Sequence, residues 1–92
     1  MDVIALNDPN RVQDKQGQVV HKLGTIHAAR PAPPDAESCE ALTFCQLPTS
    51  RMDFLQRRPL QSGKTWYPPP AVDTGRATVC PRCDDLVRQL AK

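Results

Sequence analysis

The sequence predicts a small, irregular α+β domain with an N-terminal β-hairpin, a short C-terminal helix and very little hydrophobic core. The chain has 92 residues, which is enough for one domain, and we take 1–92 as a single unit. Ten residues are proline and only 4% are aromatic, so little apolar surface can be buried. Four cysteines accompany this weak core. A domain of this size needs a staple such as a metal ion, disulfides or a partner.

Residues 1–30 are predicted to form a β-hairpin region. Apolar side chains near the start favour a short strand over 1–8, which a Pro-Asn pair then interrupts. Residues 11–23 have the pattern of a hairpin whose turn contains Gly17, a residue free to adopt a positive φ. A strand resumes over 25–27.

The middle of the chain, residues 31–76, is predicted to be extended, proline-rich and largely loop. We expect a short helical turn within 35–47 and a second short helix over 51–61, which Pro59 would end. Three consecutive prolines at 68–70 predict a rigid polyproline spacer.

The C-terminal segment 77–92 contains the most specific motif, a strand followed by Cys-Pro-Arg-Cys and a helix. Cys80 and Cys83 can bind one metal ion because the turn between them bends the chain around it. A helix over 84–91 would direct its N-terminal N–H groups toward the sulfurs, which favours the thiolate form. Strand, knuckle and helix are together the second half of a zinc-ribbon or treble-clef-like finger.

Metal binding explains these cysteines better than disulfides or redox chemistry does. The N-terminus has no basic segment followed by a long apolar run, so we expect no secretion by a signal peptide and reduced thiols. A thioredoxin-like dithiol needs a βαβ context, which a short chain with ten prolines does not supply. A thiol redox switch is the least favoured function.

One metal ion needs two ligands besides the Cys-Pro-Arg-Cys pair, and the residues alone leave the choice open. A four-thiolate set would use both upstream cysteines, although their spacing is wider than usual. A His-Cys₃ set would use one histidine and one upstream cysteine. The candidates are His21, His27, Cys39 and Cys45.

The ligand pattern resembles that of short zinc-finger proteins of actinobacteria and their phages. Their pattern reads Val-His, then Cys-Gly, then Val-Thr-Cys-Pro-Arg-Cys before a helix, and this chain has Ile-His at 26–27 and Val-Cys-Pro-Arg-Cys at 79–83. The resemblance covers about half of the chain. Glu40 or Gln46 stands where the pattern has glycine.

The resemblance implies one Zn ion per chain and a ligand set. The ligands would be His27, Cys39, Cys80 and Cys83, with Cys45 as the alternate ligand. It also implies a phage or actinobacterial origin, with the protein in the cytoplasm of a bacterial host cell or in the virion.

The motifs argue against an enzyme. Zinc deaminases carry His-x-Glu before Pro-Cys-x-x-Cys, whereas Ala29 occupies the glutamate position here. Four protein ligands would also close the coordination shell, and a catalytic zinc keeps one position open. We therefore expect no small-molecule substrate. No apolar run approaches the length of a membrane span.

The expected function is that of a non-enzymatic, zinc-stabilised interaction or structural accessory protein that docks on a larger protein or nucleoprotein assembly. Trp66 and Tyr67, beside the triple proline, are the candidate docking residues, with Arg57 and Arg58 as basic contacts. The alternative for Trp66 is a core residue that covers the zinc site.

The alternative function is a nucleic-acid-binding or transcription-modulating zinc finger. The formal net charge is only +2, whereas duplex binders are usually more basic. Affinity at low and high salt separates the two functions, because phosphate-driven binding weakens steeply with ionic strength. The basic residues available for phosphate contacts are Arg51, Arg57, Arg58, Lys64, Arg82 and Arg88.

Overall fold

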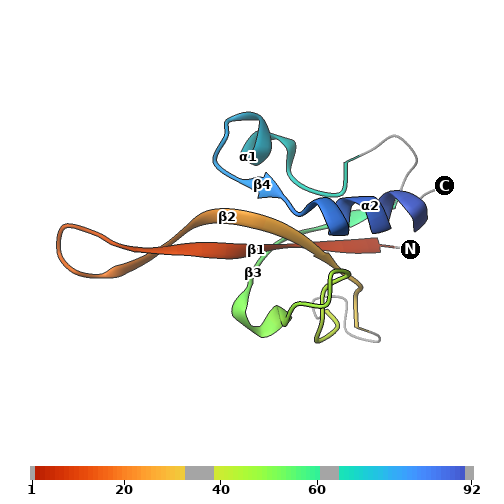
Figure 1. Cartoon of the computed structure of the whole chain (residues 1–92), viewed down its shortest axis with the longest axis horizontal. Helices are drawn as coiled ribbons and strands as arrows, with labels where there is room; N and C mark the ends of the chain where they lie inside the picture. Colours follow the sequence, from red (N-terminus) through yellow and green to blue (C-terminus); the bar gives the residue numbers. More distant parts are fainter. Residues whose placement is uncertain (1, 33–38, 61–64, 91–92) are drawn as a thin grey trace.

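The computed structural model describes residues 2–32, 39–60 and 65–90, which form a four-stranded mixed sheet with two short helices (Figure 1). The strand order is β3-β1-β2-β4, and only the β2–β4 pair is parallel. This confirms the small α+β fold. No helix in the described ranges is long and apolar enough to cross a membrane. The elements are β1 (Asp2–Gln13), β2 (Val19–Ala29), a 3₁₀ turn η1 (Thr49–Arg51), β3 (Asp53–Pro59), α1 (Pro69–Asp73), β4 (Thr78–Val79) and α2 (Pro81–Leu90).

The hairpin predicted near the N-terminus is present, and it is longer than expected. The turn is the predicted one: Gly17 has a φ of 82°, and Asp14 Oδ1 accepts hydrogen bonds from two backbone N–H groups at 2.9 Å. The expected strand break at the Pro-Asn pair is wrong. β1 continues to Gln13, and the pair sits at a β-bulge, where the register with β2 shifts between Asp8 and Asn10.

Gly24 lies opposite this bulge, where the two backbones approach closely. A Cβ atom at this position would lie 2.3 Å from the carbonyl oxygen of Asp8, so only glycine fits without a backbone shift. Asn7 Oδ1 accepts a hydrogen bond from the Gly24 N–H at 2.8 Å, which fixes the two strands at this point.

The first half of β1 and the second half of β2, which pair with each other, are buried on both faces of the sheet. Because side chains alternate along a strand, successive buried residues of β1 join two separate clusters. One cluster packs against α2 and includes Val3, Ala5, Ile26, Ala28, Trp66, Cys83 and Val87. The other contains Ile4, Leu6 and Ala29, packed against Cys39 and Met52.

The helix predicted over 51–61 is wrong, because most of this segment is the strand β3. It pairs antiparallel with the first half of β1, over Asp2–Asn7. The open edge of the central strand β1 therefore outweighs the helical spacing of a few apolar residues.

Two other expectations for the middle of the chain also need correction. The prolines at 68–70 do not form a polyproline spacer, since Pro69 and Pro70 begin α1, where their missing N–H groups leave no helical hydrogen bond unmade. The helical turn expected within 35–47 is absent from the described residues 39–47, and 33–38 lie outside the described part, as does Lys64. The predicted C-terminal strand and helix are confirmed as β4 and α2, the helix beginning earlier, at Pro81.

Candidate metal centre

The cysteine-bearing segments meet at the outer edge of β2, on both sides of His27. From one side, β4 pairs with β2 at Thr25 and Ile26, and the Cys80 N–H continues the pairing by donating to the Ile26 carbonyl at 2.9 Å. From the other side, the Phe44 N–H donates to the carbonyl of Ala28 at 2.8 Å. Backbone hydrogen bonds to the two neighbours of His27 thus bring both segments to its side chain.

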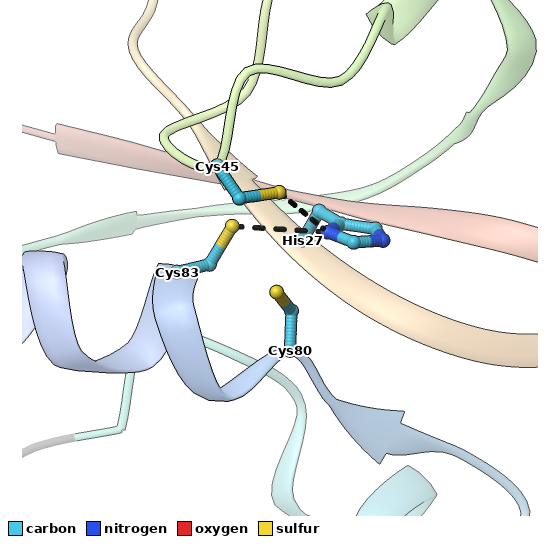
Figure 2. A group of neighbouring side chains, drawn as sticks. All are labelled: His27, Cys45, Cys80 and Cys83. Atoms are coloured by element: carbon cyan, nitrogen blue, oxygen red, sulfur yellow. Dashed lines mark hydrogen bonds between the residues drawn. The ribbon is translucent and has the colours of Figure 1, made fainter.

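Four donor atoms converge at this edge, from His27, Cys45, Cys80 and Cys83, and all lie within 4.8 Å of one another (Figure 2). The His27 Nδ1 atom lies 3.3 Å from the sulfur of Cys45 and 3.7 Å from that of Cys83. In a tetrahedral zinc site with ordinary bond lengths, nitrogen and sulfur ligands are about 3.6 Å apart. The group therefore has the residue types and spacing that zinc requires.

Cys45 is positioned by a tight turn that begins at Thr43 and ends at Leu47. The Thr43 N–H donates to the Leu47 carbonyl at 2.8 Å, and the Leu47 N–H donates to the Thr43 hydroxyl at 3.0 Å. The same hydroxyl lies 3.1 Å from the sulfur of Cys45. Gln46 has a φ of 70°, the one left-handed non-glycine conformation in the described residues.

The Cys-Pro-Arg-Cys motif lies where β4 ends and α2 begins, as predicted. Pro81 is the first residue of α2, and the N–H of Asp84 donates to the Cys80 carbonyl at 3.0 Å. Cys83 is fully buried in the first turn of the helix, and Cys80 is half-buried. Both sulfurs point toward His27 (Figure 2).

The titration behaviour of the group suits a metal site. Burial lowers the pKa of His27, an effect that the charge of Asp8 partly opposes, so the imidazole is neutral and able to bind a cation at neutral pH. Burial raises the pKa of Cys83 to about 12. Burial also acts to raise the pKa of Cys45, but hydrogen bonds, first from Thr43, outweigh it and lower the pKa. A bound cation would supply positive charge beside these crowded sulfurs and would favour their thiolate forms.

The upstream cysteine in the group is Cys45, which the resemblance implies as the alternate ligand, and the preferred Cys39 lies outside the group. Cys39 forms an isolated bridge with Pro31 and packs against the second cluster, on the sheet face opposite α2. No spacing rule could have separated the two cysteines. Cys45 lies in the group because the neighbouring Phe44 N–H donates a hydrogen bond to Ala28 at the edge of β2.

The remaining sequence candidates are not part of the group. The backbone of His21 lies in β2 opposite Arg11, away from the site, and its side chain is outside the described part. Arg57 and Arg58 lie on β3, and Arg57 pairs with Asp2.

Trp66 is a core residue, only 3% exposed, which matches the alternative role that the sequence left open. Its Nε1–H donates to Asp84 Oδ1 at 3.1 Å, and the ring of Tyr67 meets it edge-on at 5.2 Å. Trp66 therefore supports α2 next to the cysteine pair and does not project as a docking side chain.

The assignment of the His/Cys₃ group as a candidate metal site depends on this geometry alone, because comparisons with known proteins identify no relative. No protein-family model, curated protein or solved structure matches the chain. Membership of the actinobacterial and phage zinc-finger family stays a prediction.

Proposed function

We propose that the chain is a non-enzymatic interaction protein whose fold depends on one structural zinc ion. The ligands are His27, Cys45, Cys80 and Cys83. The observation that carries this proposal is the convergence of four donor atoms, from three separate segments, within 4.8 Å.

Zinc suits this donor set better than other common metals do. Thiolates and imidazole favour zinc, whereas magnesium and calcium prefer oxygen ligands. Zinc binding at such sites contributes on the order of 10 kcal/mol to folding. That amount matters here because the buried core of the described residues is small and split between two faces of the sheet.

The surroundings of the site support a structural role over a catalytic one. Four protein ligands complete a tetrahedral shell and leave no position for a substrate or a reactive water. Asp84 follows Cys83 directly, but its two carboxylate oxygens already accept hydrogen bonds from Trp66 and Arg88. This neighbouring acid is therefore held in place and is a poor general base.

The exposed surface supports an interaction function. Phe54 and Val19 are each more than half exposed at 56% and 59%, and Leu42 at 45%. These apolar side chains lie on β3, on β2 and in the loop between β2 and η1, so a partner could contact several parts of the surface. The resemblance of the ligand pattern supports an assembly of a phage or of its bacterial host as that partner.

X-ray absorption at the zinc edge tests the central part of this proposal. We expect three sulfur atoms at about 2.3 Å, one nitrogen at about 2.0–2.1 Å and no oxygen ligand. The Cys45→Ser variant should not give a three-sulfur zinc site, because it is expected to lose stoichiometric zinc, while the matched Cys39→Ser variant should give the spectrum of the unaltered protein. An oxygen ligand in the unaltered protein would contradict the closed, structural site.

A further inference from the structure

The end of the β1–β2 hairpin forms a two-stranded ribbon that projects from the rest of the molecule (Figure 1). We call residues 10–22 the distal ribbon. Every side chain from Asn10 to Val20 is exposed. β3 pairs with β1 only over Asp2–Asn7, and β4 pairs with β2 only at Thr25 and Ile26. Both edges of the ribbon are thus unpaired within the described residues.

The distal ribbon exposes apolar side chains that no other described element covers. Val12 and Val20 lie directly opposite each other and are 39% and 37% exposed. Val19 is 59% exposed. A two-stranded ribbon is marginally stable by itself, and its stability here depends on the covered half of the hairpin. An uncovered ribbon of this kind suits contact with a partner.

The charge of the ribbon points to an anionic partner. It carries three exposed cations, Arg11, Lys15 and Lys22, and one acid, Asp14, which is used in the turn as a hydrogen-bond acceptor. No ion pair involves Lys15 or Lys22 in the part of the chain that the structure describes. Arg51 adds a fourth cation at the base of the ribbon, where Arg11 Nη2 donates to its carbonyl oxygen at 3.4 Å.

The shape and register of the ribbon fit one anionic polymer in particular. The major groove of B-DNA admits a two-stranded β-ribbon. Because Arg11 pairs with His21 and Gln13 pairs with Val19, the side chains of Arg11, Gln13 and Val19 share one face. Arginine and glutamine make paired hydrogen bonds to guanine and adenine, and a small apolar side chain fits the thymine methyl group.

We propose that the distal ribbon binds the major groove of duplex DNA. The face with Arg11, Gln13 and Val19 meets the base edges. Lys15 contacts a phosphate from the turn, and Lys22, which lies on the opposite face, reaches a flanking phosphate around the unpaired edge of β2. An acidic protein would also attract the cations, but it would make no use of a face that combines arginine, glutamine and valine in groove-reading positions. The proposal names a class of partner for the proposed interaction function. It rests on that function in one respect, which is that the chain acts by binding.

The test is duplex binding by the full zinc-loaded chain, measured by fluorescence anisotropy with a 20-base-pair DNA at two salt concentrations. Two phosphate contacts predict that affinity falls roughly 12-fold between 50 and 200 mM salt. An RNA duplex should bind more weakly than DNA, because the major groove of A-form RNA is too narrow for side chains. Zinc content and thermal unfolding, measured on the same samples, report separately on the proposed zinc-dependent function.

Two matched double variants distinguish an effect of the ribbon's own cations from an effect of the overall net charge. Lys15→Gln with Lys22→Gln should weaken DNA binding at least tenfold and flatten its salt dependence, with zinc retained. Arg30→Gln with Arg76→Gln removes the same charge from exposed positions outside the ribbon and should change binding less than twofold. Absent DNA binding, equal losses in both doubles, or equal affinity for RNA and DNA would overturn the proposal. So would docking on a protein with no affinity for DNA, whereas a folded chain without zinc would overturn only the proposed function.

Discussion

The two halves of the β1–β2 hairpin share one backbone ladder and differ in their surroundings. In the first half, Val3 and Ile26 are fully buried, and His27 joins the metal group at the edge of the sheet. In the distal ribbon, the side chains at the tip are exposed and both edges are unpaired among the described residues. Backbone pairing thus sets the shape of the whole hairpin, while burial and the packing of the His/Cys₃ group anchor only one end. The other end is left available for a partner.

The largest expected effect comes from two cysteines at the anchored end, of which Cys45 belongs to the His/Cys₃ group and Cys39 packs on the other side of the sheet. Cys45→Ser should abolish stoichiometric zinc binding and the cooperative unfolding transition, because zinc contributes on the order of 10 kcal/mol to folding. Cys39→Ser should keep one zinc per chain. Metal analysis after gel filtration, together with calorimetry, measures both effects. A Cys39→Ser variant that loses zinc while Cys45→Ser retains it would reverse our ligand assignment.

Truncation of apolar side chains should distinguish the anchored region from the ribbon. Trp66→Ala should destabilise the zinc-loaded protein by about 3–5 kcal/mol, because it empties a buried site beside α2 and leaves Asp84 without its indole donor. Val19→Ala, at an exposed position, should change stability by no more than about 0.5 kcal/mol. Urea unfolding with zinc in excess measures both. Similar losses in the two variants would show that the ribbon is buried in solution.

Zinc affinity should rise with pH between about 6.5 and 8. The raised pKa of Cys83 means that its thiol must release a proton when zinc binds in this range, and each released proton makes the affinity change roughly tenfold per pH unit. The pKa of His27 is lowered below its ordinary 6.5, so the imidazole releases no proton above that pH. Competition with a chelator at several pH values measures the slope. An affinity independent of pH would contradict ligation by Cys83.

The smallest expected effect is a gain in stability from Gln46→Gly. The left-handed conformation of Gln46 costs a non-glycine residue roughly 1–2 kcal/mol, and glycine avoids this cost. Glycine also loses more conformational entropy on folding, which offsets part of the gain. We expect a net stabilisation of up to about 1 kcal/mol and unchanged zinc stoichiometry. Thermal unfolding measures the effect. Gln46→Ala is the control and should give no gain, because alanine carries the same Cβ.

The features that the sequence predicted correctly are local ones. The turn at Gly17, the strand into Cys80 and the C-terminal helix, which was predicted over 84–91 and begins at Pro81, depend on residues only a few positions apart. The missed features depend on distant segments. β3 is a strand because β1 offers it an edge, and Cys45 joins the group because Phe44 pairs with Ala28. Neither contact leaves a signal in residue spacing.

Trp66 shows the same limit on sequence reasoning. Its place beside prolines and a tyrosine suggested an exposed docking arm. Its burial depends on α2, which begins fifteen residues later and supplies the carboxylate that accepts its hydrogen bond. The choice between a core and a surface tryptophan was therefore set by tertiary packing.

Native mass spectrometry of the chain purified without chelator, combined with unfolding before and after zinc removal, tests the central claim most directly. We predict one zinc ion per chain and a cooperative unfolding transition that disappears when a chelator removes the metal and returns when zinc is restored. A chain that carries no metal and still folds cooperatively and resists proteolysis would contradict the account.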